Sequence, residues 1–274
     1  MPEESDKGRT IARAAQILDS LARNSGGAEL GDIAARAQMS PSGAHRALRA
    51  LIDVGLATQD GARGRYRLGP RILVFAQGMN GENALLASAE SELDTLNRDS
   101  GETVVLTVLR DGKMWNIASR EGTGDLISRG NLGGEPHFHA SARGLLFLAH
   151  MPRPEARALI RSTGLPALTP HTITNEEELW TAVDEARRRH LAWSRDTSVM
   201  GSSGVAAPII DPDGSIVACV AVHLPSANLT PDTCKRLEQQ IASAARQIEQ
   251  RSAQARTWPG HTNRSNDPTP EGQP

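Results

Sequence analysis

One stretch of this sequence, residues 30–68, reads LGDIAARAQMSPSGAHRALRALIDVGLATQDGARGRYRL and predicts two short helices followed by a hairpin. The first helix breaks just before Ser40, which supplies an N-cap for the second helix and is followed by proline in the first helical position. Gly55 stands where a C-terminal glycine commonly ends a helix. Residues 56–59 and 65–68 then alternate as two short strands around a Gly-rich turn. The pattern is typical of a winged helix-turn-helix.

The second of these helices has two unlike faces. Its apolar stripe recurs at helical spacing and comprises Ala44, Ala47, Leu48, Leu51 and Ile52. Its opposite face is small, polar and basic and comprises Ser42, Gly43, His45, Arg46 and Arg49. A helix that packs on one side and presents small residues and arginines on the other suits the major groove of DNA. We predict that Arg46 reads guanine. A face that is merely solvated is the alternative.

The predicted hairpin carries three arginines in or beside its turn, namely Arg63, Arg65 and Arg67. A wing places such side chains over phosphates or in the minor groove, and we predict those contacts here. Arg9, Thr10 and Ser40 are expected to add contacts to the DNA backbone. The alternative is that one or two wing arginines only cover the protein surface.

Charge is distributed unevenly along the chain. From Lys7 to Arg71 there are eleven Lys or Arg and five Asp or Glu, whereas the whole chain of 274 residues has a formal net charge of −2. A basic module on an acidic body indicates that only one part binds nucleic acid. A helix predicted over Arg9–Arg23 completes the core of this module through Ile11, Ala14, Ala15, Leu18 and Leu21.

The chain divides into two predicted domains and two tails. We predict the winged helix-turn-helix over residues 9–69, a linker helix over 70–82 and an effector-binding domain over 83–251. Residues 1–8 and 252–274 are polar and aperiodic, and we expect them to be disordered. The linker and the first helix offer a second subunit an apolar seam formed by Ile72, Leu73, Phe75 and Met79. Packing of this seam within its own chain is the alternative.

The larger domain is expected to be α+β, with helices flanking an antiparallel sheet. Two pairs of strands turn at Asp111-Gly112 and at residues 211–214. The predicted helices cover residues 83–99, 139–150, a segment beginning near 154, 174–190 and 231–251. Thr174 has the spacing of a capping box with Glu177. Cys219 and Cys234 are expected to be small core residues rather than a disulfide.

The usual catalytic and cofactor motifs are absent from the sequence. There is no HExxH, Walker A, GxGxxG or GxSxG pattern, so we expect no catalytic site, no cofactor and no metal. A metal site formed by His137, His139 and His223 is the alternative to structural or ligand-contacting histidines. The N-terminus does not read as a signal peptide, and no apolar run approaches the ~18 residues that span a bilayer. We therefore expect a cytoplasmic protein without a membrane partner.

The chain resembles the IclR-type bacterial transcription regulators from about Arg9 to Arg251. The resemblance rests on LGDIAARAQMSPSGAHRALRALIDVGLATQDGARGRYRLGPRIL in the DNA-binding half. In the second half it rests on HFHASARGLLFLA, LTPHTITNEEELWTAVDEARRRHLAWSRD and GVAAPIIDPDGSIVACVAVHLP. It implies a winged helix-turn-helix joined by a linker helix to a GAF-like effector-binding domain. It also implies a homodimer, or a dimer of dimers, on a palindromic operator in double-stranded DNA, controlled by an organic or aromatic acid.

The same resemblance places the effector at the turn around Ala142 and Arg143. Backbone N–H groups at a helix N-terminus favour an anion, and an arginine can grip a carboxylate with two hydrogen bonds. The predicted effector contacts are Leu126, Leu132, Phe138, His139, Ser141, Ala142, Arg143, Asp196, Ser203, Cys219, Ala221 and His223. Period-two alternation places the last three on one face of a strand. The alternative is that Arg143 points to solvent and His223 is a satisfied core histidine.

The sequence departs from the family pattern where relatives hold their ligand. A Gly-Lys pair is frequent in the family where this chain has Gly144-Leu145, and the run RDTSVMGSSG contains Asp196 as its only acid. Ala221 and His223 stand on a strand where a small polar residue is common. The effector is therefore expected to differ from those of the best-known relatives.

The sequence indicates a DNA-binding regulator, which we expect to be a repressor, and leaves two other functions open. One is a small-molecule enzyme or metal-dependent hydrolase with an accessory nucleic-acid module. A convergent group of catalytic or metal-binding residues would favour it. The other is a structural nucleic-acid protein, which a second domain without a pocket would favour.

Overall fold

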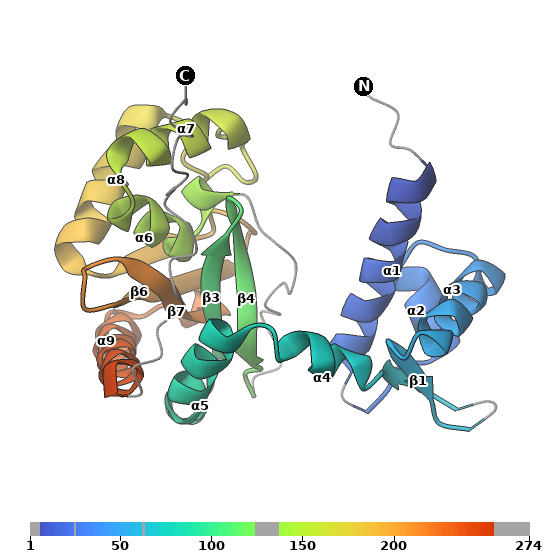
Figure 1. Cartoon of the computed structure of the whole chain (residues 1–274). Coiled ribbons are helices and arrows are strands. Elements are labelled where there is room, and N and C mark those ends of the chain that lie inside the picture. The colour runs from blue at the N-terminus through green and yellow to red at the C-terminus, as the bar shows by residue number, and fades with distance from the viewer. Residues whose placement is uncertain (1–5, 25, 62–63, 124–136, 255–274) are drawn as a thin grey trace, which may run out of the picture. The chain divides into compact units, whose positions relative to one another are not determined.

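A computed structural model describes residues 6–24, 26–61, 64–123 and 137–254. They form two compact units that divide between Asn80 and Gly81 (Figure 1). Arg63, Leu126, Leu132 and most of the tail predicted over 252–274 lie outside the described residues, as does the side chain of Arg9.

The N-terminal unit has three helices, a two-stranded wing and a short fourth helix (Figure 1). Its elements are α1 (Asp6–Ala22), α2 (Leu30–Arg36), α3 (Pro41–Asp53), β1 (Ala57–Gln59), β2 (Tyr66–Leu68) and α4 (Arg71–Ala76). The predicted order of elements is confirmed. The predicted disorder of residues 1–8 is wrong from Asp6 onward, because α1 begins there.

The core of this unit gathers Ile17, Leu21, Ile33, Leu48 and Tyr66. The sequence placed Ile11 and Ala15 in this core, and that placement is wrong: Ile11 is 73% exposed and Ala15 is also exposed. Among the described side chains of α1, the buried ones all lie in its second half, where α2 and α3 pack. Ile17, which the apolar pattern missed, fills the centre instead.

The turn between α2 and α3 follows from its residues. Gln38 has a φ of +50°, and the N–H of Met39 donates to the carbonyl of Ala34 at 2.9 Å, which closes α2. Ser40 then caps α3, because its Oγ accepts a hydrogen bond from the N–H of Gly43 at 3.2 Å. The predicted break and N-cap are both confirmed. The wing strands are antiparallel, as predicted, and each is one residue shorter than expected.

The C-terminal unit contains a five-stranded antiparallel sheet in the order β4-β3-β7-β6-β5. Its strands are β3 (Thr103–Arg110), β4 (Lys113–Arg120), β5 (Ala192–Arg195), β6 (Ser202–Ile210) and β7 (Ile216–Pro225). The two predicted hairpins are confirmed as β3–β4 and β6–β7. The sequence did not predict β5, a four-residue edge strand.

Helices cover both faces of this sheet (Figure 1). One face packs against α5 (Asn80–Ser100) and α9 (Pro231–Gln254) through residues that include Val104, Val205 and Val222. The other packs against η1 (Phe138–Ala140), α6 (Ala142–His150), α7 (Arg153–Thr163) and α8 (Glu176–Arg189). A short η2 (Ser226–Asn228) follows β7. Along a strand, alternate residues therefore belong to different helix layers.

Several predicted boundaries in this unit change. The expected single linker over 70–82 is two helices, since α4 ends at Ala76 and α5 begins at Asn80. The predicted capping box at Thr174 is wrong, because Asn175 caps α8 by accepting from the N–H groups of Glu177 and Glu178. Helix α9 continues to Gln254, and Ser252 is fully buried, so the predicted tail begins too early. Cys219 is buried as predicted, whereas Cys234 is half-buried, and neither forms a disulfide.

Candidate DNA-binding face and effector site

The polar face of α3 is open to solvent. Ser42, His45, Arg46 and Arg49 are exposed, and Gly43 is half-buried. Within the described residues neither Arg46 nor Arg49 forms an ion pair. Both guanidinium groups therefore project from a helix whose other face is anchored by Ala44, Leu48 and Leu51. This is the arrangement that a recognition helix needs.

Ser40 and Gly43 stabilise the start of α3. Ser40 Oγ caps the helix and lies 3.3 Å from Ser42 Oγ. A Cβ on Gly43 would lie 3.1 Å from Ser40 Oγ, so a side chain there would crowd the cap. Thr10 is exposed on α1.

Two wing arginines, Arg65 just before β2 and Arg67 on it, project to the same side of the hairpin. Arg65 and Arg67 are exposed and flank Tyr66, which is buried. Arg65 Nη2 lies 3.6 Å from Glu29 Oε1, and Arg67 Nε donates to Asp60 Oδ2 at 2.9 Å. Reciprocal hydrogen bonds between Ala28 and Tyr66, each 2.9 Å long, fasten the wing to the chain before α2. Backbone hydrogen bonds thus fix the wing to the rest of the unit, and Arg65 and Arg67 each form an ion pair with a carboxylate.

In the C-terminal unit, the predicted effector turn begins α6. Ser141 caps this helix by accepting from the N–H of Gly144 at 3.1 Å. Arg143 is only 5% exposed, and its Nη1 donates to Thr107 Oγ1 at 3.1 Å and to Asn116 Oδ1 at 2.5 Å. The alternative in which Arg143 points to solvent is therefore wrong.

Thr107 and Asn116 were not among the predicted site residues. They are register partners on β3 and β4, and Thr107 Oγ1 donates to Asn116 Oδ1 at 2.7 Å. Both are buried polar residues in the middle of their strands. The sequence signal that could have identified them is a polar residue at a strand position that alternation predicts to be buried. Such a residue needs a hydrogen-bond partner inside the protein.

Two predicted contacts on β7 share the layer of Arg143. Cys219 is the register partner of Thr107, and both Cys219 and Ala221 pack in the cluster of Phe138 and Ala142. The structure therefore brings these predicted residues together. Burial raises the pKa of the Cys219 thiol, which argues against a reactive cysteine.

Two histidines of the predicted set have buried ring nitrogens. His223 follows Ala221 at period-two spacing, and its Nε2 is buried without a hydrogen-bond partner among the described residues. Burial, reinforced by the nearby Arg143, lowers the pKa of His223 to about 3. His139 Nε2 donates to the carbonyl of Pro166 at 3.0 Å, whereas its Nδ1 is buried without a described partner. Burial lowers the pKa of His139 as well, so both rings are neutral near pH 7.

Ser203 and Asp196 were predicted to lie with these residues, but the structure places them elsewhere. Ser203 alternates with Val205 and Ala207, which pack toward α9, so it lies on the opposite face of the sheet from Cys219. Asp196 has a φ of +58°, and its Oδ1 accepts from the N–H of Gly201 and from Ser226 Oγ, both at 2.7 Å. The bond from Ser226 lowers the pKa of Asp196. The Asp196 carboxylate therefore stabilises the loop between β5 and β6 instead of facing the predicted site.

Two family descriptions match this chain. Residues 10–61 match the IclR helix-turn-helix domain, and residues 79–250 match the bacterial transcriptional regulator IclR C-terminal domain. The chain belongs to the IclR family. Its fold class and its relation to DNA-binding transcriptional regulators, as predicted, are thereby confirmed.

Individual relatives agree with the IclR assignment. The chain is 32% identical to an HTH-type transcriptional regulator of Mycobacterium tuberculosis, over 79% of this chain and 82% of the relative. It is 26% identical to the acetate operon repressor of Salmonella typhimurium, over 88% of each chain. These relatives are transcriptional regulators.

Solved IclR structures share this fold. The IclR of Thermotoga maritima gives a TM-score of 0.68 at 24% identity, covering 89% of this chain and 98% of that one. An IclR homologue from Microbacterium hydrocarbonoxydans complexed with 4-hydroxybenzoate gives a TM-score of 0.66 at 25% identity, covering 89% and 99%.

Two features of the described residues bear on the alternatives to an IclR regulator. Across the described residues, no group of three or more His, Cys, Asp or Glu side chains is placed to hold a metal ion, so His137, His139 and His223 do not gather as that alternative requires. No helix in the described ranges is both long enough and apolar enough to cross a membrane.

Proposed function

We propose that this IclR-family protein is a repressor that binds a palindromic operator as a homodimer or a dimer of dimers. We propose further that a small organic acid with an apolar or aromatic part controls it. The exposed face of α3, with Arg46 and Arg49 free of ion pairs among the described residues, carries the first part of this proposal. Regulators named as repressors among the relatives, from Salmonella typhimurium and Klebsiella pneumoniae, support the sign of regulation.

The proposed effector site is the start of α6 and the strand layer beneath it. A helix N-terminus attracts an anion, and the buried guanidinium of Arg143 adds a positive charge in a region of low dielectric. Neutral His139 and His223 offer ring nitrogens that a hydroxyl or amide of the ligand can satisfy. Phe138, Ala142 and Ala221 pack in the same buried cluster and are the apolar side chains that we expect the ligand to contact. The 4-hydroxybenzoate bound by one homologue has this chemistry.

Calorimetric titration with 4-hydroxybenzoate and related organic acids tests the effector site. We expect an aromatic acid to bind, with an affinity at least tenfold lower for His223→Ala, because loss of a hydrogen bond to a buried group costs about 1.5 kcal/mol. Arg143→Lys keeps the charge but not the planar fork, and we expect it to weaken binding similarly. Arg98→Ala, an exposed arginine on α5, is the matched control and should bind as the wild type does. Equal affinity for all four proteins would exclude this placement of the ligand.

Dimerisation is proposed because one recognition helix reads too few base pairs to single out an operator. The apolar seam on α4 and just after it supports this proposal, since Leu73 is 70% and Phe75 is 56% exposed in the single chain. Met79 is also exposed and Ile72 is half-buried. Exposed apolar side chains gathered on one short helix mark an interaction surface.

We expect the wild type to sediment as a dimer or tetramer at micromolar concentration and Leu73→Glu/Phe75→Glu to sediment as a monomer. The added carboxylates would have to be buried in the interface, which costs several kcal/mol. Val199→Glu replaces an equally exposed apolar residue of the other unit and should remain at least dimeric. A monomeric wild type in analytical ultracentrifugation would refute the proposed dimer.

A further inference from the structure

Helix α5 is bound to the β3–β4 hairpin near both of its ends. At its first turn, Glu82 Oε1 accepts two hydrogen bonds from Arg110, one from Nε at 3.1 Å and one from Nη2 at 2.7 Å. The Glu82 side chain is only 16% exposed. Both hydrogen bonds are charge-assisted and end on one shielded oxygen, which fixes the geometry of the pair, and the Arg110 side chain is 43% exposed.

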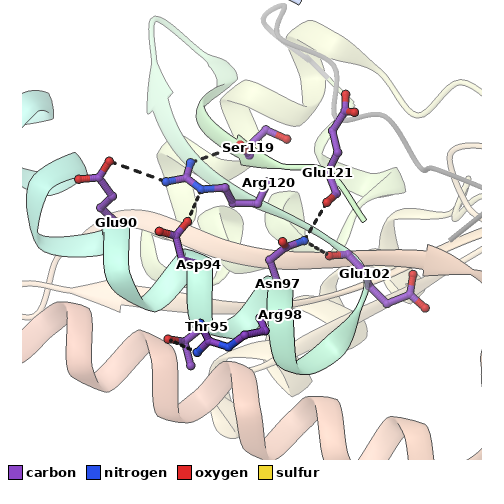
Figure 2. Close-up of polar contacts among 9 residues, drawn as sticks. All are labelled: Glu90, Asp94, Thr95, Asn97, Arg98, Glu102, Ser119, Arg120 and Glu121. Carbon is purple, nitrogen blue, oxygen red and sulfur yellow. Dashed lines mark hydrogen bonds and ion pairs between the residues drawn. The ribbon is translucent and has the colours of Figure 1, made fainter. Parts of the chain in front are cut away.

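The C-terminal half of α5 makes a second set of bonds (Figure 2). Arg120 Nε donates to Asp94 Oδ1 at 2.5 Å, and its Nη2 lies 3.9 Å from Glu90 Oε1. Asn97 Nδ2 donates to the carbonyl of Glu102 at 2.8 Å and to that of Glu121 at 3.0 Å. These bonds attach the C-terminal half of α5 to the chain at the start of β3 and at the end of β4. It is attached to the hairpin as one body.

The same hairpin holds the arginine of the proposed effector site. Thr107 and Asn116, in the middle of β3 and β4, both accept from Arg143. Arg110 lies three residues beyond Thr107 on the same strand, and its partner Glu82 lies two residues after Asn80, where α5 begins. Two sets of hydrogen bonds, joined by three residues of β3, therefore connect Arg143 with the start of α5, which follows α4 in the chain.

We propose that the Glu82–Arg110 ion pair transmits the state of the effector site to the segment that joins α4 and α5. This inference rests on the proposed function. Coupling between two sites requires an element whose state both of them bias, and the β3–β4 hairpin contacts Arg143 at one point and α5 at another. The bonds of Figure 2 attach the far end of α5, so they steady the helix without reaching α4.

Hydrogen exchange of the linker amides, residues 73–81, measured by mass spectrometry on the full-length protein, tests this proposal in a double-mutant cycle. Arg143→Met removes the bonds to the hairpin, and we expect it to raise linker exchange about fivefold. In a Glu82→Gln background the same substitution should change linker exchange by less than twofold. In an Asp94→Asn background, which weakens only the far attachment, the fivefold effect should persist.

Two results would overturn the proposal. One is an equal response to Arg143→Met in the wild-type and Glu82→Gln backgrounds, and the other is no response in the wild type. If Arg143→Met does not fold, as judged by circular dichroism, Thr107→Val removes one of the same bonds and takes its place in the cycle. The experiment uses neither effector nor operator, so its failure is distinct from failure of the calorimetric or DNA-binding tests.

Discussion

Arg46→Ala is expected to remove most of the preference of this protein for its operator over random DNA. An arginine that donates to O6 and N7 of guanine contributes about 1–3 kcal/mol of base discrimination, which is roughly 5- to 150-fold for each half-site. Arg46 suits this part because it is exposed on α3 and has no ion pair among the described residues that would have to break first. Binding to random DNA depends mainly on phosphate contacts and should change little.

Fluorescence anisotropy on operator and random duplexes, over a range of salt concentrations, measures this effect. Arg65→Ala is the matched control, because it removes an exposed arginine from the wing instead of from α3. It should weaken both duplexes similarly and lower the salt dependence by about one ion at most. Equal losses on the two duplexes for Arg46→Ala would show that this residue reads no base.

Gly144→Ala is expected to destabilise the C-terminal unit and to distort the proposed effector turn. A Cβ at this position would lie 2.1 Å from the carbonyl oxygen of Phe138 and 2.4 Å from its Cα. Both are backbone atoms, and Phe138 is itself fully buried, so no flexible side chain can give way. Overpacking of this kind costs about 1–3 kcal/mol or more. For a unit of this size, that lowers the melting temperature by roughly 2–4 °C per kcal/mol.

Differential scanning calorimetry measures the melting temperature, and binding of an organic acid reports on the turn. Gly31→Ala is the control, because no atom lies within 4 Å of the Cβ it would add to α2. Alanine is the better helix former by about 0.5–1 kcal/mol, so this control should be neutral or more stable. A Gly144→Ala protein that melts at the wild-type temperature would mean that Phe138 can move away.

Local chemistry explains which parts of the fold could be predicted. The α3 helix and the wing follow from caps, glycines and alternation within a few residues, and the structure confirms them. Which side chains of α1 are buried could not be predicted in the same way. Ile11 and Ile17 are equally apolar, and only packing against α2 and α3 determines that Ile17 is buried and Ile11 exposed. Strand β5 is short and lies at a sheet edge, so its alternation gives little signal.

The candidate site shows the same limit. Alternation grouped Cys219, Ala221 and His223 correctly within one strand, but it could not relate that strand to β6. Ser203 pairs with Leu224 rather than with His223, and this one-residue step in register puts it on the other face. Arg143 was predicted as a site residue from the resemblance to the IclR family, with support from its place at a helix start. Its partners Thr107 and Asn116 come from strands more than twenty residues away, and only the folded sheet brings them together.

The carboxylates beside the wing arginines have a consequence for how the protein searches a genome. Glu29 and Asp60 already occupy Arg65 and Arg67 in the way that phosphates would. In the proposed complex, Arg65 and Arg67 would each exchange a carboxylate for a phosphate, so we expect a smaller net gain and less counterion release than for two unpaired cations. We expect this competition to shorten residence on random sequence. Arg46 and Arg49 on α3 have no such competitor among the described residues, so we expect a larger share of the binding energy to come from the contacts that we propose distinguish one sequence from another.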